Sequence, residues 1–491
     1  MTTKSSNSQK VLKGISSQTL VTLLLGVVEI ASFSVMSRLL TKEDFGYYAA
    51  IMAIVTVFAS FSETGIGSAI IQRKELTKKY VDNAFTLSLM FGSFISLLLF
   101  LLSGVLAQTI ADRSMTKPLM IMSVTLLLHC LTSVFTSIMH RRLEFLRVGG
   151  IHLVSLIITT VIAIWLAYQG YGYYAIMTKA VLQSLLIFVM SFVFCKTKFG
   201  LAFDLPTVQS IFKFSGWLMA SVVFRNLAHQ VDKLLMPRLL SISALGAYNR
   251  PKDFINQIST KLNGIFDTAM FPVLSSLQDE PHKLQSAFRK SLYILNLFAV
   301  LLTLSFVINS ELIVRIFLGS EWLELTGIMV VLSLVLVFNI DGRLSDCYLR
   351  SMGMTKQQFY FRVFEAVIKI VGVLIGYPWG IMGIAISVVL TNSISKLIKI
   401  VYIASKVNIT PMETLITIVQ SWKFALFLVP ACLLIYHILP HNLYGNFFLA
   451  VAYFSLTIVI FAYFPHAVGN VYADSVHHKL ISTIKSKLHL S

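Results

Sequence analysis

The sequence predicts an all-α polytopic membrane protein with about 14 transmembrane helices, arranged as two parallel six-helix lobes followed by two C-terminal helices. Three observations predict this fold: little charge, fourteen apolar segments long enough to cross a bilayer, and a motif that recurs 200 residues later. Of the 491 residues, 56% are hydrophobic and 13% are charged, whereas about 25% of the residues of a soluble domain are charged. The composition therefore excludes a cytosolic enzyme, a disordered chain and a nucleic-acid-binding protein.

Each apolar segment is interpreted as a helix. A bilayer core about 30 Å thick requires about 20 apolar residues in helical conformation. Most segments are continuous runs of Leu, Ile, Val and Phe without alternation, which favours helices over barrel strands. The first has no small-residue cleavage site and is followed by further spans, so it is predicted to be an uncleaved helix. The predicted spans are 15–37, 45–71, 84–110, 118–139, 149–168, 173–195, 212–236, 253–275, 291–310, 325–349, 360–377, 381–404, 423–439 and 445–465.

The net charge of +18 reports mainly on orientation. With the N-terminus in the cytoplasm, 26 of the 40 Lys and Arg residues fall on predicted cytoplasmic segments and eight on outer segments. Cytoplasmic loops carry such an excess of Lys and Arg, so both termini are predicted to be cytoplasmic. Apolar residues at helical spacing in 405–422 and 474–490 predict amphipathic helices on the inner membrane surface, although the tail could also be a solvated, frayed end.

An internal repeat gives the arrangement of the spans. Residues 36–48 read MSRLLTKEDFGYY and residues 236–248 read MPRLLSISALGAY, with six identities in thirteen positions. A second, weaker echo pairs 171–182 with 379–390. Six spans separate the copies in both cases, and an even number of spans restores the same orientation. The repeat is therefore parallel, with two lobes related by an axis along the membrane normal.

The repeat also predicts the domain boundaries. We expect an N-lobe over residues 1–200 with spans 1 to 6 and a C-lobe over 201–405 with spans 7 to 12. Residues 406–491 would contain spans 13 and 14 and the amphipathic cytoplasmic tail. Two lobes with a site between them are a common transporter architecture.

Two stretches around the repeat carry a resemblance to a known family. Residues 37–76 (SRLLTKEDFGYYAAIMAIVTVFASFSETGIGSAIIQRKEL) resemble the N-terminal signature of Wzx-type polysaccharide flippases of the MOP (multidrug/oligosaccharidyl-lipid/polysaccharide) superfamily. Residues 230–254 (QVDKLLMPRLLSISALGAYNRPKDF) resemble the counterpart in the second lobe. The resemblance covers the whole chain and points towards the colanic-acid or exopolysaccharide branch.

The resemblance implies a function. It implies a protein of the bacterial inner membrane that moves an undecaprenyl-pyrophosphate-linked oligosaccharide to the outer leaflet of the lipid bilayer. The two-lobe architecture predicts that it acts by alternating access, with a proton or Na⁺ gradient resetting the cycle. The resemblance also makes the polysaccharide polymerase and export machinery candidate partners, and it implies no nucleic acid.

Charged side chains at bilayer depth are costly and usually face a cavity or a partner. In the seventh span, Arg225, His229 and Asp232 lie at i, i+4 and i+7 on one helix face, with Lys233 beside them. The headgroup that the resemblance implies is anionic, so an inward stripe of basic side chains would lower the cost of its transfer. The alternative is an internal ion pair of Asp232 with Arg225 or Lys233.

Three further bases are predicted to contribute to a cationic cavity. Lys261 lies among Asn, Thr and Asp residues in the eighth span. Arg343 and Lys369 lie towards the cytoplasmic ends of spans 10 and 11, where an interhelical charge network is an equally good interpretation. The predicted substrate-binding residues are Arg225, His229, Lys233, Lys261, Arg343 and Lys369.

Acidic residues within the spans are candidates for ion coupling. A buried carboxylate can carry a coupling proton or bind Na⁺, but it can also simply bond a neighbouring helix. The coupling candidates are Glu29, Glu63, Asp232 and Asp267.

No cofactor, no metal and no enzymatic activity are predicted. The four Cys residues are widely spaced and form no CxxC pair. The chain has no Walker A sequence, and nearly all its loops are too short to build an active site. A membrane glycan polymerase or ligase would need a sizeable periplasmic loop, and a multidrug cation antiporter of the same superfamily would favour acids over bases in its cavity. These two functions are the alternatives.

Overall fold

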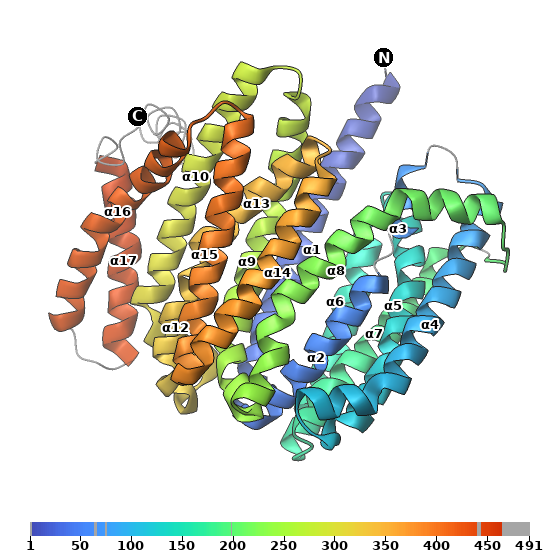
Figure 1. Ribbon diagram of the computed structural model, residues 1–491, viewed down its shortest axis with the longest axis horizontal. Helices are drawn as coiled ribbons and strands as arrows, with labels where there is room; N and C mark the ends of the chain where they lie inside the picture. The colour runs from blue at the N-terminus through green and yellow to red at the C-terminus, as the bar shows by residue number, and fades with distance from the viewer. Residues whose placement is uncertain (1, 63–65, 74–75, 198, 439–442, 464–491) are drawn as a thin grey trace. The chain divides into compact units, whose positions relative to one another are not determined.

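The structure, a computed structural model, describes residues 2–62, 66–73, 76–197, 199–438 and 443–463 (Figure 1). Within these ranges the chain forms helices and short helical turns and no strand, which confirms the predicted all-α polytopic fold. Ten helical stretches of the described residues are long and apolar enough to cross a membrane. One of them, Lys356–Lys406, contains two predicted spans.

The chain divides into two compact units, of which unit 1 comprises Met1–Arg250 and Arg362–Ile381. The predicted lobe boundaries at residues 200 and 405 remain a prediction. The helices that begin in the first segment of unit 1 are α1 (Thr2–Leu39), α2 (Lys42–Ser62), α3 (Ile66–Gln72), α4 (Lys78–Ile110), α5 (Thr116–Arg141), α6 (Phe145–Tyr168), α7 (Tyr173–Cys195), α8 (Leu205–Leu239) and α9 (Ile242–Ser276). A short 3₁₀ turn, η1 (Arg113–Met115), precedes α5.

Unit 2 comprises Pro251–Phe361 and Met382–Ser491. Helices α9 and α14 each contribute residues to both units. The remaining elements are α10 (Pro281–Ile308), α11 (Ser310–Ile313), η2 (Val314–Leu318), η3 (Ser320–Leu325), α12 (Thr326–Ser333), α13 (Val335–Ser351), α14 (Thr355–Gly376), η4 (Tyr377–Trp379), α15 (Gly380–Lys406), α16 (Pro411–Ile438) and α17 (Leu443–Tyr463).

The described residues of all fourteen predicted spans lie mainly on helices. The span predicted at 45–71 coincides with α2 and α3, and residues 63–65 between them lie outside the described residues. The span predicted at 325–349 is divided between α12 and α13. Helices α8 and α9 are each 35 residues long and contain four of the six predicted substrate-binding residues, and neither is among the ten described stretches that are long and apolar enough to cross a membrane.

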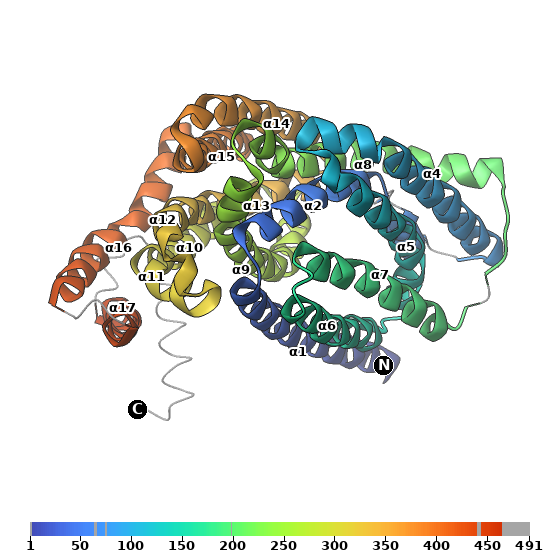
Figure 2. The ribbon, with the colours of Figure 1, turned by 90° about the horizontal axis from the view of Figure 1, so that it is seen from below.

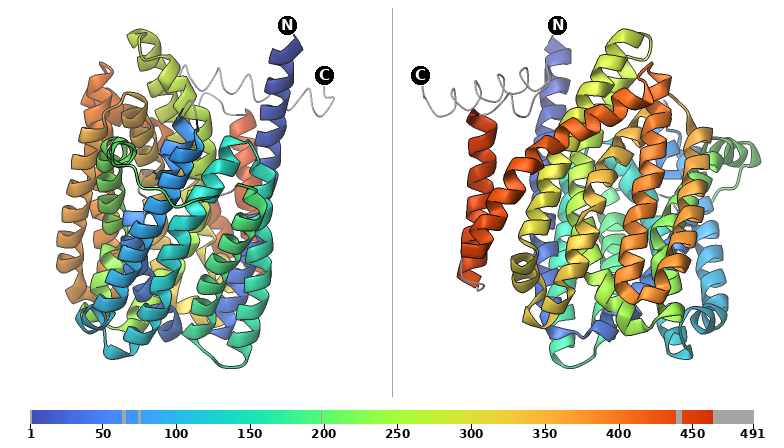
Figure 3. Two further views of the ribbon diagram at one scale, coloured as in Figure 1. Left: turned by 90° about the vertical axis from the view of Figure 1, so that its right-hand side faces the viewer. Right: turned by 60° about the vertical axis from the view of Figure 1, so that its left-hand side comes forward.

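The two predicted surface helices have different outcomes. The stretch 405–422 is not a separate helix, because most of it forms the first half of α16, which runs obliquely to α15 (Figure 3). In this half, Thr414 and Ser421 are buried whereas Met412 and Val419 are exposed. The apolar side of the helix therefore faces away from the protein, as lipid contact requires. The tail 474–490 lies outside the described residues.

The core of unit 1 lies between α3, α4, α5 and α7, around the ring of Phe135. The rings of Phe85, Phe188 and Phe199 lie within 5.0–6.1 Å of it, centroid to centroid. Helices α1, α6 and α7 lie side by side in this unit (Figure 2). Large apolar side chains such as Leu101 on the outer faces are exposed, which is expected where the solvent is lipid.

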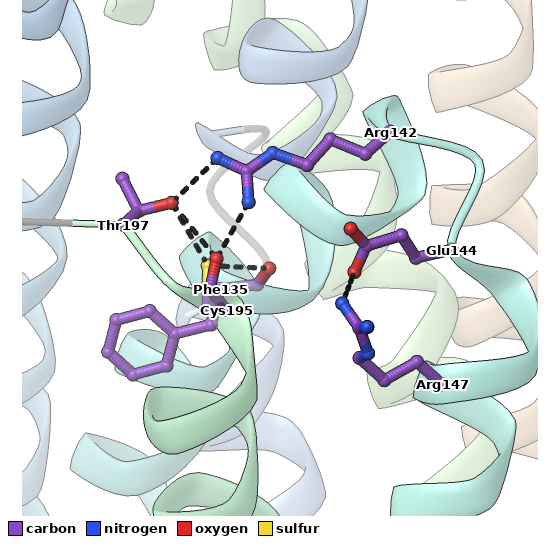
Figure 4. Close-up of polar contacts among 6 residues, drawn as sticks. All are labelled: Phe135, Arg142, Glu144, Arg147, Cys195 and Thr197. Carbon is purple, nitrogen blue, oxygen red and sulfur yellow. Dashed lines mark hydrogen bonds and ion pairs between the residues drawn. The ribbon is translucent and has the colours of Figure 1, made fainter.

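At the end of this core that is predicted to be cytoplasmic, a group of hydrogen bonds joins α5 to α7 (Figure 4). Arg142, at the α5–α6 turn, donates from Nη1 to the Cys195 carbonyl at 2.7 Å and from Nη2 to Thr197 Oγ1 at 3.0 Å. The guanidinium thus satisfies a carbonyl at the C-terminus of α7, where helices leave such groups without internal partners. One side chain fixes the ends of α5 and α7 together.

Unit 2 has two apolar clusters. One joins α10, α13 and α15 to the start of α16 and includes Phe288 and Tyr348, whose rings meet edge to face at 5.7 Å. The other joins α10 to α16 and α17 and includes Tyr293, Cys432 and Tyr453. The Tyr453 hydroxyl donates to the Leu301 carbonyl. The two C-terminal helices are therefore attached to α10.

The two copies of the repeated motif contact each other. A Cβ atom on Gly46 would lie 2.0 Å from the Ile242 carbonyl oxygen, and one on Gly246 would lie 1.7 Å from the Lys42 carbonyl oxygen. Residues 42 and 242, like 46 and 246, occupy equivalent positions in the repeat. The contact is therefore reciprocal, as two-fold symmetry requires, and only glycine allows the backbones of α2 and α9 to approach this closely.

The repeat also conserves the start of each helix. Thr41 Oγ1 accepts from the Asp44 amide at 3.2 Å, and Ser241 Oγ accepts from the Ala244 amide at 3.0 Å. These hydroxyls are N-caps of α2 and α9, each satisfying an amide of the first turn. In the first copy the Asp44 carboxylate also accepts from the Thr41 amide at 3.0 Å, which completes a capping box.

The glycine contact gives a first prediction. Gly246→Ala would place a methyl group inside the contact distance of a backbone carbonyl, so α2 and α9 would have to separate. We expect a loss of stability at the upper end of the ~1–3 kcal/mol typical of overpacking. Thermal unfolding of the purified protein in detergent measures it.

Gly150→Ala is the matched control, because Gly150 also lies within a helix, α6, and a Cβ there meets no atom within 4 Å. It should stabilise the protein slightly through helix propensity. Equal stability of the Gly246→Ala and Gly150→Ala variants would contradict the proposed close crossing.

Candidate functional site

The predicted basic stripe lies on α8 within unit 1. Arg225 is partly buried, and its Nε donates to Asn226 Oδ1 at 3.3 Å. Asn226 in turn donates from Nδ2 to Ser60 Oγ on α2 at 2.7 Å. His229 is exposed, and Lys233 is partly buried. The neighbouring amide thus orients the guanidinium, while the imidazole remains accessible.

Asp232 lies on α8 close to this stripe and is completely buried. Lys369 of α14, also buried, places its Nζ 3.4 Å from Asp232 Oδ1 and donates to the Ala228 carbonyl at 2.9 Å. The Tyr248 hydroxyl of α9 donates to Asp232 Oδ2 at 2.6 Å. Three helices thus meet at one carboxylate, with a predicted coupling residue and a predicted substrate-binding residue in a single ion pair.

Arg250 is a buried base near Asp232 that the sequence analysis did not name, because it placed this residue in an outer connection. The structure places it in α9, buried, with its guanidinium 3.4 Å from the Phe33 ring centroid and 3.9 Å from that of Phe45. It also donates from Nε to Ser37 Oγ at 2.9 Å. Arginine can stack on aromatic rings and donate in its plane at the same time, so both kinds of contact are satisfied.

Glu29 lies on α1 and is partly buried. It interacts electrostatically with Lys179 of α7, which donates to Ser32 Oγ at 2.6 Å. The sequence could indicate that each residue is a charge within an apolar span. It could not indicate that the two lie close together, because that depends on how α1 and α7 pack.

Unit 2 contains a second buried pair that the sequence analysis also missed. Lys399 of α15 is 1% exposed and lies 3.0 Å from Asp346 Oδ1 of α13. Lys396, one turn earlier, is buried with its stem against Gly342. Both lysines lie within the predicted span 381–404 and in α15, but they were counted with the cytoplasmic connection that follows and were not named as candidate residues.

Not every predicted residue joins these clusters. Arg343 is partly buried on α13 in unit 2. Lys261 and Asp267 lie in the helical backbone of α9, but their side chains are outside the described residues, as is Glu63. Arg362 pairs at 2.7 Å with Glu365, one turn away on the same helix, α14. The assignment of individual residues to substrate or ion remains a prediction.

Comparison with known proteins identifies the family. Residues 35–327, more than half of the chain, match the profile of a family described as polysaccharide biosynthesis protein. The chain is 22% identical over 396 residues to the lipopolysaccharide biosynthesis protein WzxC of Escherichia coli (strain K12), covering 80% of each chain.

Two solved structures show the fold. The lipid II flippase MurJ, in an inward closed conformation, superposes with a TM-score of 0.71 at 16% identity, covering 90% of this chain and 98% of MurJ. An inward-facing multidrug resistance MATE family transporter of the MOP superfamily gives a TM-score of 0.65 at 13% identity, covering 79% and 98%. The chain therefore belongs to the polysaccharide biosynthesis protein family and has the fold of MOP superfamily transporters.

Proposed function

We propose that this multi-pass membrane protein is a flippase that moves an undecaprenyl-pyrophosphate-linked oligosaccharide repeat unit from the cytoplasmic to the periplasmic leaflet of the bacterial inner membrane. The family and the name of the WzxC relative support a role in polysaccharide biosynthesis. The fold supports transport rather than catalysis. Both termini would be cytoplasmic, as the distribution of Lys and Arg favours.

The observation that carries the proposal is the charge balance around α8. Arg225, Lys233 and Lys369 are basic, and Asp232 is the acid among them, so the group has net positive charge. Asp232 is fully buried beside Lys369, whereas Arg225 is partly buried and His229 is exposed. An anionic pyrophosphate would therefore meet a cationic surface whose guanidinium can bond phosphate oxygens bidentately.

The buried pair suggests a way to couple an ion. The Lys369 ammonium already supplies the positive charge next to Asp232, where Na⁺ would otherwise bind. Protonation of Asp232 would remove the attraction that holds α14 to α8 at this point. We therefore favour a proton as the coupling ion, with Asp232 as its carrier and alternating access as the cycle.

The second prediction concerns Arg225. Arg225→Ala should reduce headgroup exposure to the periplasm by about tenfold or more, because a charge-assisted bond to phosphate is lost. Arg225→Lys should retain part of the activity if charge alone matters. Accessibility of the lipid-linked headgroup in spheroplasts measures both variants.

Arg238→Ala is the matched control, since it removes the same side chain from an exposed position near the end of the same helix. Normal surface polysaccharide in Arg225→Ala cells at normal protein level would remove Arg225 from the binding site. A deletion strain separates the alternative functions: a flippase strain accumulates complete lipid-linked repeat units inside, a polymerase strain exports single units, and an antiporter strain does neither.

The third prediction concerns the Asp232–Lys369 pair. Either single substitution, Asp232→Asn or Lys369→Met, should destabilise the protein by about 3–5 kcal/mol, because a buried charge loses its counter-charge. The double variant should lose less than the sum of the two. Unfolding in detergent measures all three, and transport by the double variant under an imposed pH gradient measures coupling.

Lys79→Met is the control for the pair, because Lys79 makes a mostly exposed ion pair with Asp204 at 2.9 Å that should contribute at most about 1 kcal/mol. Additive effects at Asp232 and Lys369 would contradict the ion pair. If the double variant folds and its transport still responds to the pH gradient, another acid must carry the coupling proton.

A further inference from the structure

Unit 2 contains a pocket of about 280 Å³ between the end of α10 and the two C-terminal helices. Its walls are mainly apolar and include Leu304 of α10, Val429 of α16 and Leu449 of α17. Its polar end is formed by residues around the α10–α11 junction and the start of α12, among them Asn309 and Glu311. The pocket lies among helices predicted to span the membrane, so a lipid can reach it from the bilayer.

The polar end contains a buried acceptor without a partner. Asn309 is 5% exposed, and its Nδ2 donates to the Ser305 carbonyl at 2.9 Å. A carbonyl oxygen cannot donate, so this bond fixes which end of the amide is nitrogen. The Asn309 Oδ1 atom is buried and accepts no hydrogen bond. An unsatisfied buried acceptor is costly, so a ligand that donates a hydrogen bond would be stabilised here.

Two further groups at this end are acceptors. Thr326 Oγ1 uses its proton to donate to the Leu323 carbonyl at 2.7 Å, which leaves its lone pairs available. Glu311 contributes a carboxylate, and its Oε1 accepts from Arg315 Nη2 at 2.9 Å. An alkylammonium group carries three donors and a positive charge, which matches a site with an amide oxygen, a hydroxyl oxygen and a carboxylate.

A basic residue beside the pocket supplies the complementary group: Arg315 does not itself line the pocket, but it is paired with Glu311, which does. It lies one helical turn beyond Glu311, and its buried Nε atom has no hydrogen-bond partner. A guanidinium N–H is a strong donor to phosphate. This end of the unit therefore contains a buried acceptor without a donor, Asn309 Oδ1, and a buried donor without an acceptor, Arg315 Nε.

We propose that this pocket binds a zwitterionic amine lipid of the phosphatidylethanolamine type. The ammonium bonds the acceptors at Asn309, Glu311 and Thr326. The phosphate bonds Arg315, and the upper part of one acyl chain lies against Leu304, Val429 and Leu449. The volume is near the lower limit of ligand pockets, about 300 Å³, so it holds the headgroup and the start of one chain, and the rest stays in the bilayer. The proposal does not depend on the cargo proposed above.

Binding of three lipids to the delipidated full-length protein tests this inference, with native mass spectrometry as the readout. Phosphatidylethanolamine has an ammonium with three donors, phosphatidylcholine has the same charges but no N–H group, and phosphatidylglycerol is anionic. We expect phosphatidylethanolamine to bind about tenfold or more tightly than either of the others, because only its headgroup offers N–H donors and a positive charge together to the amide oxygen, the hydroxyl oxygen and the carboxylate. Equal or tighter binding of phosphatidylcholine or phosphatidylglycerol would overturn the proposal.

Two variants of the pocket and one control locate the site. Asn309→Leu should lower the affinity for phosphatidylethanolamine to that for phosphatidylcholine. Asn392→Leu is the control, because Asn392 of α15 makes the same bond to the preceding turn, to the Val388 carbonyl at 2.8 Å, but does not line the pocket. Val429→Trp fills the apolar part without changing a polar group, and should weaken binding of the amine lipid as well. Unchanged binding in Val429→Trp, or equal effects of Asn309→Leu and Asn392→Leu, would place the lipid elsewhere and refute the inference.

Discussion

The crossing of α2 and α9 at Gly46 and Gly246 is the contact on which the polar centre of unit 1 depends. Two helices whose backbones touch have little freedom to rotate or slide, so the residues that follow on α9 are fixed with respect to α1 and α8. Tyr248 reaches Asp232 half a turn later, and Arg250 reaches Phe33 and Ser37 about one turn later. A motif that first appears as a sequence repeat thus positions the buried charges.

Those charges occur as pairs because an unpaired ion has a high free energy in a low-dielectric environment. Asp232 with Lys369 and Asp346 with Lys399 are buried acid–base pairs that join separate helices. Such a pair is not strong evidence for stability, since well-packed apolar residues can replace it at little cost. Its value lies in its response to protonation, which removes one charge and leaves the other. A protein that must change conformation can use this asymmetry.

Different parts of the site were predictable to different degrees. The stripe on α8 and the choice of Asp232 and Lys369 as candidate residues followed from charge in apolar spans, but the expected partners of Asp232 were residues on its own helix. The structure instead pairs it with Lys369 of another helix. Arg250 was assigned to a connection, because helix ends were inferred from hydropathy and α9 begins before its apolar run. Lys396 and Lys399 lie within the predicted span 381–404 but were counted with the cytoplasmic connection after it. Nothing in the sequence indicated that the side-chain oxygen of Asn309 would be buried without a donor, since an isolated Asn at a helix end usually acts as a cap.

The sequence by itself determined the fold class, the number and position of the apolar segments, the parallel repeat and the family. These properties can be derived from the linear sequence alone. The thickness of the bilayer sets the length of each apolar segment, and a repeat is found by comparing the sequence with itself. The tertiary structure decided which charges meet, where glycine is obligatory and where a pocket remains open. Pairing depends on which helices become neighbours and how they are rotated, and that information arises only when side chains from distant segments pack together.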